Sequence, residues 1–341
     1  MMPVVIALAS VLIVSLVAPF ALKPLLLRMG VIDVPNSRSS HTRPVIRGAG
    51  LAPLLAVIVG YAVLLGGTDS AELATLIVIV GVSLAAGLLG WVEDTRGLPV
   101  AVRAGMQLAI GLVGAGALVA YADGSWWAVP IYAIAVAAYI NVANFMDGVN
   151  GISGLHGVIV GVTYATLGVI AETPWLTTAG WILALAFAGF LPWNLVQGRM
   201  FLGDVGSYLL GGGIAIVAVA AIVHGVPVIA VLGPMLIYLA DTGVTLVRRV
   251  ARGERWFEAH KSHTYQRLNS LGLSHLQVAS IVAAMSICTG AAGLLALLSP
   301  ELTLRSAMIM SVVVVAYLML PATIRRMWRK SPAVAESRLS G

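Results

Sequence analysis

The sequence predicts an all-α polytopic membrane protein with about eleven transmembrane helices. Of its 341 residues, 60% are hydrophobic and 10% are charged, whereas soluble domains carry roughly 25% charged residues. The mean hydropathy is +0.98, and a soluble globular domain cannot bury that much apolar surface. The same composition excludes a disordered chain and a nucleic-acid-binding domain. It also excludes a disulfide scaffold, since the single cysteine, Cys288, lies within an apolar run and has no second cysteine to pair with.

Eleven apolar runs are each close to the length of about 20 residues that a helix needs to cross a bilayer core. The first run has no basic segment before it and is long for the core of a signal peptide, so we expect it to be retained. Residues 1–324 are predicted to form a single integral membrane domain, followed by a basic cytoplasmic tail at 325–341. The predicted spans are 3–27, 49–66, 71–91, 102–121, 127–143, 153–171, 175–193, 206–223, 226–247, 275–297 and 303–324.

The distribution of charge predicts the orientation in the membrane. Alternation of the eleven runs places 19 of the 20 basic residues on one side, and only Arg305 on the other. Because basic loops stay in the cytoplasm, the N-terminus is predicted outside and the C-terminus inside. The pI of 9.7 then reflects this asymmetry rather than an affinity for nucleic acid. Almost every unusual polar residue falls on the cytoplasmic side, where we expect the active site.

The first two cytoplasmic loops carry groups suited to phosphates and cations. Arg43 and Arg47 stand among Gly, Pro and hydroxyl residues, a mixture that can enclose phosphates. An ordinary basic loop on anionic lipid headgroups is the alternative. Glu93 and Asp94 end a span, and adjacent carboxylates favour a divalent cation or a cationic partner. The alternative is an acidic helix end in contact with water or Arg96.

The third and fourth loops present amide and carboxylate oxygens. Asn141 and Asn144 share a helix face that Asp147 extends if the helix continues, and such oxygens are typical Mg²⁺ ligands. A turn rich in Asn, Asp and Gly is the alternative. Asp204 stands between two glycines, where a ligand can approach the backbone closely. The alternative for Asp204 is a partner of the helix N-terminus.

An acid and a basic loop complete the set of candidates. Asp241 lies inside the ninth span, where an ionisable group is costly and usually functional; the alternative is a buried acid paired with a neighbouring helix. His260, His263 and Arg267 follow in the longest basic loop. On a helix these three side chains would share one face. Without a cysteine or a third histidine nearby, a cationic face for phosphate or diphosphate is preferred to a zinc site.

Together these segments resemble the polyprenyl-phosphate N-acetylhexosamine-1-phosphate transferases of glycosyltransferase family 4. That group includes GlcNAc- and FucNAc-1-phosphate transferases and the phospho-MurNAc-pentapeptide transferases. The resemblance extends from Asp33 to about Leu268. It is carried by the Arg/His/Pro/Arg-Gly loop at 38–50, Glu93-Asp94, Asn144-x-x-Asp147-Gly-x-Asn-Gly151, Phe201-Leu-Gly-Asp204-x-Gly-Ser207, Asp241-Thr242 and His260-x-x-His263.

The resemblance implies that a UDP-N-acetylhexosamine and undecaprenyl phosphate react to give undecaprenyl-diphospho-sugar and UMP. This is the first membrane step of O-antigen, and hence lipopolysaccharide, or of other cell-envelope glycans. It implies a location in the cytoplasmic (inner) membrane, a site on the cytoplasmic face and a homodimer. It also implies Mg²⁺, or Mn²⁺ in its place, held by Asp204 and Asn144.

The same resemblance implies a role for each remaining candidate. The catalytic candidates are Asp94, Glu93, Asp147 and His263, and Asp94 with Glu93 would prepare or position the lipid phosphate. The substrate-binding candidates are Arg43, Arg47, Asn150, His260, Arg267 and Asp241. The chain departs from the family pattern at Glu93 and Asn150, where Asp is usual. Glu93 makes Asp94 the safer catalytic candidate, and Asn150 leaves the identity of the donor open.

Three points stay open in the sequence. Direct attack is preferred to a covalent aspartyl intermediate because a phosphate monoester is largely ionised at neutral pH. A secondary transporter using Asp241 is the first rival, although it would place polarity at the membrane midplane in related halves. An inactive scaffold is the second rival. The sugar (GlcNAc, FucNAc, QuiNAc or another), the pathway and the oligomeric state are not specified.

Overall fold

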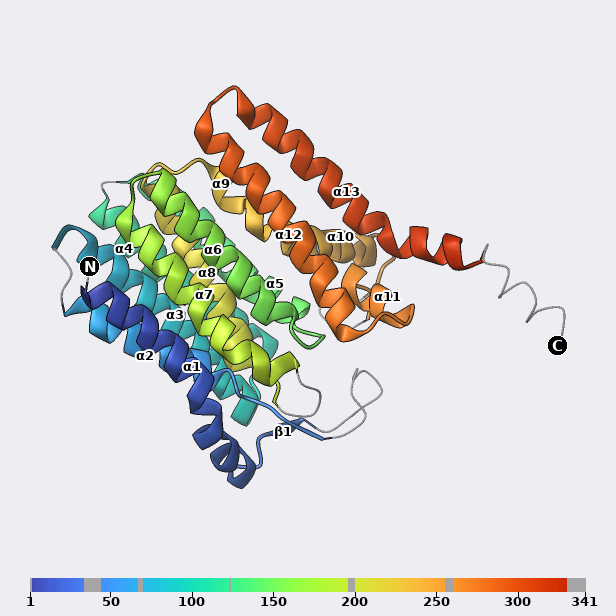
Figure 1. Cartoon of the computed structure of the whole chain (residues 1–341), viewed down its shortest axis with the longest axis horizontal. Coiled ribbons are helices and arrows are strands. Elements are labelled where there is room, and N and C mark those ends of the chain that lie inside the picture. Colours follow the sequence, from blue (N-terminus) through green and yellow to red (C-terminus); the bar gives the residue numbers. More distant parts are fainter. Residues whose placement is uncertain are drawn as a thin grey trace.

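The computed structural model describes residues 2–33, 44–66, 70–122, 124–195, 200–254 and 261–329. These residues form a bundle of helices with one two-stranded antiparallel ribbon, in which Ile32 lies opposite Ile46 (Figure 1). The elements are α1 (Met2–Arg28), β1 (Ile32–Asp33), β2 (Val45–Ile46), α2 (Leu51–Leu65), α3 (Ser70–Arg96), α4 (Val100–Tyr121), η1 (Trp126–Ala128), α5 (Val129–Met146), α6 (Ile152–Ile170), α7 (Pro174–Leu195), α8 (Gly203–Val223), α9 (Val228–Leu232), η2 (Gly233–Met235), α10 (Leu236–Ala251), α11 (Thr264–Ser270), α12 (His275–Leu298) and α13 (Leu302–Arg329).

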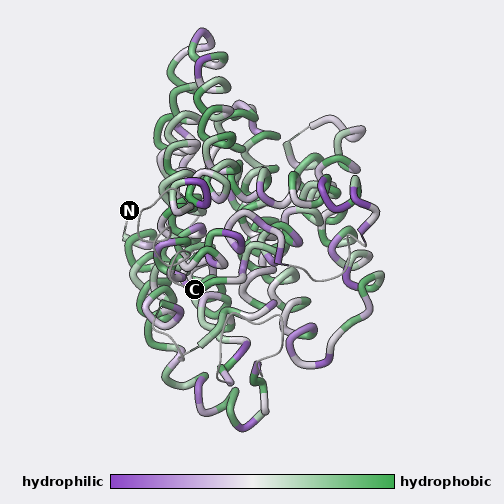
Figure 2. Tube along the Cα trace, turned by 90° about the vertical axis from the view of Figure 1, so that its right-hand side faces the viewer, coloured by the Kyte–Doolittle hydropathy of each residue, from purple (hydrophilic) through white to green (hydrophobic). Residues whose placement is uncertain are grey.

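The helices coincide with the predicted apolar runs. Within the described ranges, ten helices are long and apolar enough to cross a membrane. The run at 49–66 forms α2, an apolar helix of 15 residues, which at 1.5 Å per residue is about 22 Å long and shorter than a typical bilayer core. Figure 2 shows hydrophobic residues along the helices. The protein is therefore an all-α multi-pass membrane protein, and its orientation stays a prediction. Helix α13 continues to Arg329, so the tail predicted from 325 begins as helix.

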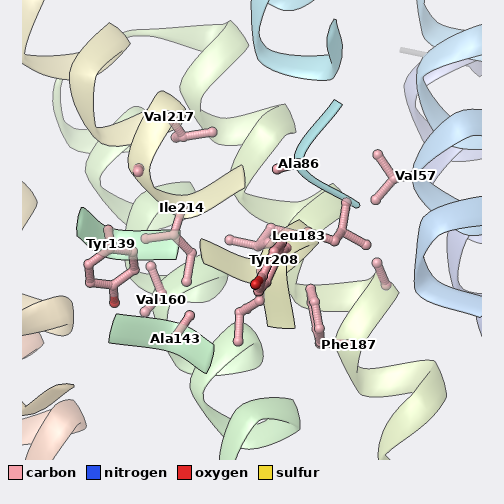
Figure 3. Close-up of a cluster of buried hydrophobic side chains, with 14 of the residues drawn as sticks. Val57, Ala86, Tyr139, Ala143, Val160, Leu183, Phe187, Tyr208, Ile214 and Val217 are labelled. Atoms are coloured by element: carbon pink, nitrogen blue, oxygen red, sulfur yellow. The ribbon is translucent and has the colours of Figure 1, made fainter. Parts of the chain in front are cut away.

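Helix α8 lies at the centre of the bundle because it is apolar on every side. Every residue from Val205 to Ala221 is buried, as expected for a helix without a polar face. Helices α2 to α7 all contact it. Figure 3 shows Tyr208 and Ile214 of α8 among side chains of neighbouring helices, including Ala86 of α3 and Tyr139 of α5. The position of α8 therefore determines where the polar groups at its first turn lie.

Glycines allow α3 and α5 to approach α8 closely. A Cβ atom at Gly90 of α3 would overlap the main-chain carbonyl of Asp204. A Cβ atom at Gly211 of α8 would lie 2.6 Å from the Cα of Ile140 in α5. Small residues permit such backbone contacts between transmembrane helices. As a result, the C-terminal end of α3 lies directly against the first turn of α8.

Main-chain hydrogen bonds hold the first loop at the same place. The N–H of Phe201 donates to the carbonyl oxygen of Ile46 at 2.8 Å. The N–H of Gly50 donates to the carbonyl oxygen of Leu202, also at 2.8 Å. Arg47 lies between these two bonds along the chain, so its main chain is fixed opposite the start of α8.

The ninth predicted span, 226–247, consists of two helices joined by a turn. Helix α9 ends at Leu232, and the 3-10 turn η2 contains Gly233 and Pro234 before α10 begins at Leu236. Proline lacks the N–H that a continuous helix requires, and its ring clashes with the preceding turn. The span therefore changes geometry before it reaches Asp241.

Substitution of Gly90 by Ala is expected to destabilise the fold, because the added methyl group would overlap main-chain atoms of Asp204 that cannot rotate away. Overpacking costs about 1–3 kcal/mol, and we expect the upper end of that range. Thermal unfolding of the purified protein measures the effect. Gly81→Ala, on the same helix, is the matched control because no atom lies within 4 Å of its added Cβ. Equal unfolding midpoints for the two variants would contradict this packing.

Candidate active site

Asp94 binds the N-terminus of α8 from the neighbouring helix α3. Its Oδ1 accepts the N–H of Asp204 at 3.0 Å, and its Oδ2 accepts the N–H of Val205 at 2.9 Å. Nε of Arg47 lies 2.6 Å from the same Oδ1, and the Asp94 side chain is 0% exposed. The first N–H groups of a helix lack partners within that helix, and a carboxylate is favoured there by the helix dipole. Both oxygens of Asp94 are therefore engaged in holding α8 and Arg47.

Arg47 joins two carboxylates at the edge of this cluster. Its Nη2 donates to Oδ2 of Asp204 at 2.8 Å, while its Nε contacts Asp94. The fork of the guanidinium group suits this bridging, which a lysine cannot reproduce. The Arg47 side chain is 36% exposed and that of Asp204 is 14% exposed. Unlike Asp94, these two side chains remain accessible from outside the bundle.

Neutral oxygen-bearing side chains surround Asp204. Nδ2 of Asn144, near the end of α5, donates to Oδ1 of Asp204 at 2.8 Å and to Oγ of Ser207 at 3.1 Å. The structure thus brings the two predicted metal ligands together. Within the described residues, no three His, Cys, Asp or Glu side chains gather as a metal site. A cation here would therefore be held by one carboxylate together with amide and hydroxyl oxygens.

Glu93 faces away from its neighbour Asp94. Its Oε1 accepts from Nη1 of Arg103 in α4 at 2.7 Å, and its Oε2 accepts the N–H of Leu98, also at 2.7 Å. These bonds fasten the turn between α3 and α4. The partner of Glu93 is Arg103, and not Arg96 as the alternative interpretation suggested.

Asp147 lies beyond the end of α5, which stops at Met146. The helix does not continue through Asp147, so the condition under which Asp147 would extend the face of Asn144 is not met. Oδ1 of Asp147 accepts from Oγ of Ser153 at 2.6 Å. Burial raises the pKa of Asp147 to about 7; the hydrogen bond from Ser153 opposes that rise, and the negative charge of Asp204 adds to it. The charge of Asp204 therefore affects the pKa of Asp147, although no hydrogen bond between the two is described.

The two other asparagines of this segment point to different partners. Asn141 donates to Oε1 of Gln107 in α4 at 2.6 Å, so it does not share the direction of Asn144. Asn150 is buried, and its N–H donates to Nδ1 of His275 at 3.3 Å. Asn141 and Asn144, three residues apart on α5, therefore contact different helices. The i, i+3 spacing predicted neighbours on the helix surface but could not separate these two directions.

Asp241 binds the N-terminus of α11 as Asp94 binds that of α8. Its Oδ1 accepts the N–H of Thr264 at 2.7 Å, and its Oδ2 accepts the N–H of Tyr265 at 3.1 Å. Oη of Tyr317 in α13 donates to Oδ2 at 2.7 Å. Asp241 is 0% exposed. This geometry matches the interpretation of a buried acid paired with polar groups of neighbouring helices.

His263 is the N-cap of α11 and has an extended backbone (φ −60°, ψ 150°), so it lies outside the helix that contains Arg267, and the helix face expected to include both residues is wrong. Nδ1 of His263 lies 3.5 Å from Oδ1 of Asp241, and its ring stacks on Phe145. Arg267, in the middle of α11, is exposed. Arg43 and His260 lie outside the described residues.

Tyr265, which the sequence analysis did not select, connects α11 to the third loop. Its hydroxyl donates to the carbonyl oxygen of Phe145 at 2.9 Å, and a Cβ at Gly148 would overlap that hydroxyl. Burial raises the pKa of Tyr265 well above its ordinary value. Arg103 and Ser153 were missed as well. Of these residues, only Arg103 could have been selected from the sequence, because it is a basic residue at the end of a predicted span.

Comparison with known proteins shows which family the chain resembles. A model of glycosyl transferase family 4 matches residues 76–222. That range contains Glu93, Asp94, Asn144, Asp147 and Asp204, the acids and the amide just described. Over these residues the chain is similar to glycosyl transferase family 4. Of the cluster at the start of α8, only Arg47 lies outside the matched range.

The chain is also similar to curated proteins over most of its length. It is 27% identical to a probable undecaprenyl-phosphate N-acetylglucosaminyl 1-phosphate transferase of Bacillus subtilis, over 80% of this chain and 78% of the relative. It is 26% identical to a decaprenyl-phosphate N-acetylglucosaminephosphotransferase of Mycolicibacterium smegmatis, over 76% and 73%. It is 27% identical to the undecaprenyl-phosphate alpha-N-acetylglucosaminyl 1-phosphate transferase of Escherichia coli K12, over 79% and 77%.

Substitution of Asp94 by Asn is expected to lower the free energy of unfolding by about 3 kcal/mol. The reason is that Arg47 loses a buried counter-charge and one N–H of α8 would face an amide NH₂. Thermal and denaturant unfolding of the purified variant measure this loss. Glu93→Gln is the matched control on the same helix, with an expected loss of about 1 kcal/mol from a partly exposed pair. Wild-type stability in Asp94→Asn would show that Asp94 does not hold α8.

Proposed function

We propose that this protein transfers N-acetylhexosamine 1-phosphate from a UDP-sugar to undecaprenyl phosphate, giving undecaprenyl-diphospho-sugar and UMP. The observation that carries the proposal is the cluster of Arg47, Asp204, Asn144 and Ser207 at the first turn of α8. It lies at the ends of membrane-length helices, where the phosphate of a membrane-bound lipid would meet a soluble donor. The names of the relatives, which combine a polyprenyl phosphate with N-acetylglucosamine 1-phosphate transfer, support the same reaction.

In the proposed reaction, an oxygen of the acceptor phosphate attacks the phosphorus that carries the sugar. The bridging P–O bond to the UMP portion breaks as the new P–O bond forms, and UMP leaves with the bridging oxygen. Both substrates are anions, so their mutual repulsion must be offset. The guanidinium group of Arg47 is accessible for this purpose, being 36% exposed.

The oxygens around Asp204 suit Mg²⁺. Magnesium in phosphoryl-transfer enzymes is usually held by one or two carboxylates together with substrate phosphates and water. Asp204 offers the carboxylate. The side chains of Asn144 and Ser207 carry further oxygens, and Nδ2 of Asn144 links both of them by donating to Oδ1 of Asp204 and to Oγ of Ser207. When bound, the ion would neutralise charge that develops on the diphosphate. Mn²⁺ has the same preference for oxygen ligands and could replace it.

The environment of Asp94 supports direct attack over a covalent aspartyl intermediate on that residue. Both of its oxygens accept main-chain N–H groups, and the side chain is enclosed. A phosphate monoester is largely ionised at neutral pH and needs no base to become nucleophilic. We therefore assign Asp94 to positioning α8 and Arg47, and Asp204 to the metal.

The finer parts of the proposal follow from charge and family. We infer an active site on the cytoplasmic face of the cytoplasmic (inner) membrane, because the basic residues gather at that end. GlcNAc is the first donor to test, in view of the relatives' names. A role at the start of O-antigen or another envelope glycan, and a homodimer, complete the proposal. The similarity to glycosyl transferase family 4 favours an enzyme over a transporter or an inactive scaffold.

Membranes containing the protein are expected to convert UDP-GlcNAc, or another UDP-N-acetylhexosamine, and undecaprenyl phosphate into UMP and a lipid diphospho-sugar. Mass spectrometry of the lipid product identifies the sugar. Chelation by EDTA is expected to abolish product formation, and added Mg²⁺ or Mn²⁺ to restore it. Absence of product with every such donor, from well-folded protein, would refute the proposed function. Full turnover in the presence of EDTA would refute the proposed dependence on a divalent metal ion.

Asp204→Asn is expected to reduce turnover by about 100-fold or more, because it removes the carboxylate that faces the metal. Its free energy of unfolding should fall by only about 1 kcal/mol, as in Glu93→Gln, because a partly exposed ion pair is lost. Glu301→Gln, at the opposite end of the bundle, is the control that removes a carboxylate without loss of turnover. Unchanged turnover in Asp204→Asn would remove this residue from the site.

A further inference from the structure

A second group of cations lies around a cavity of about 600 Å³ between α10, α11 and α13. This volume is within the range of about 300–1,000 Å³ typical of small-molecule sites. No acidic side chain occurs among the described residues that line the cavity, although Glu254 pairs with Arg249 nearby. The cations of the lining are Arg248, Arg249, Arg252, Lys261 and Arg267. The cavity is therefore suited to an anion.

This cavity lies on a different side of α11 from the cluster at Asp204. Tyr265 is buried and reaches the end of α5, where its hydroxyl donates to Phe145. Arg267 follows two residues later, which is about 200° around a helix, and lines the cavity. Tyr265 and Arg267 of the same short helix thus point to opposite sides, Tyr265 towards the end of α5 and Arg267 towards the cavity.

One wall of the cavity is apolar. Leu318, Met319 and Ala322 of α13 line it, and Met319 is 55% exposed. Helix α13 is long and apolar enough to span a membrane, and most of its surface is not covered by the rest of the chain. The cavity thus combines cations with the lipid-facing side of a membrane helix. This arrangement fits an anionic headgroup with attached acyl chains, whereas a soluble anion would make no use of the apolar wall.

We propose that this cavity binds the phosphate headgroup of an anionic phospholipid, with its acyl chains along α13. Basic pockets between helices at the cytoplasmic membrane surface bind such headgroups. Thr245 lines the cavity and donates to Asp241 at 3.4 Å, and Asp241 also holds α11 and Tyr317 of α13. A bound lipid therefore stabilises the junction of α10, α11 and α13. The proposal does not depend on the proposed transferase activity.

The test measures lipid binding to the purified full-length protein without turnover. Delipidated protein is titrated with phosphatidylglycerol or with phosphatidylcholine, and bound lipid is counted by native mass spectrometry. The wild type is expected to prefer phosphatidylglycerol. The double variant Arg248→Gln/Arg252→Gln is expected to bind phosphatidylglycerol about 30-fold more weakly, from two charges near the membrane surface. Because these side chains are exposed, the fold should persist. Lys261→Gln gives a second variant with a smaller expected loss.

Arg325→Gln/Arg326→Gln is the matched control, since both arginines are exposed on α13 but are not among the residues lining the cavity. It is expected to bind phosphatidylglycerol like the wild type. Binding of UDP-GlcNAc, measured by calorimetry without acceptor, should be unchanged in the cavity variant. Wild-type affinity for phosphatidylglycerol in the cavity variant would overturn the proposal. Weakened UDP-GlcNAc binding with unchanged lipid binding would also overturn it, and would assign the cavity to the donor's diphosphate.

Discussion

The arrangement of polar groups depends on one interaction, the acceptance of two main-chain N–H groups of α8 by the carboxylate of Asp94. The two helices are 110 residues apart in sequence at this point, and the bonds measure 3.0 and 2.9 Å. Gly90 permits the approach, and the first loop is hydrogen-bonded to the residues just before α8. Asp204 then emerges at a fixed place, between Arg47 and Asn144. Without this cap, the central helix would begin with unsatisfied N–H groups at the membrane boundary.

The same solution occurs a second time. Asp241 accepts the first N–H groups of α11 and also the hydroxyl of Tyr317, so one buried acid joins three helices. In both places an acid that would be costly near a membrane is fully supplied with donors. The acids near the membrane boundary therefore fall into two groups that differ in exposure. The enclosed Asp94 and Asp241 hold helices in place, and the partly exposed Asp204 is the acid that we propose for chemistry.

Much of the fold follows from the sequence, because bilayer thickness sets the length of an apolar run independently of tertiary contacts. The convergence of the polar loops at one end was predictable for the same reason. The break at Gly233-Pro234 was not predicted, although a dipeptide of this kind can interrupt a helix. The partners of Asp94 were not predictable, because they are main-chain groups distant in sequence. Likewise, spacing grouped Asn141 with Asn144, whereas packing against α4 and α8 separates them.

The central claim is that Asp94 holds the first turn of α8 while Asp204 is free to act on substrates. Amide hydrogen exchange over residues 203–208, in wild type, Asp94→Asn and Asp204→Asn, tests it most directly. Exchange reports the local opening of this turn, independently of turnover. The account predicts faster exchange in Asp94→Asn and exchange close to wild type in Asp204→Asn. Unchanged protection of this turn in Asp94→Asn would contradict it.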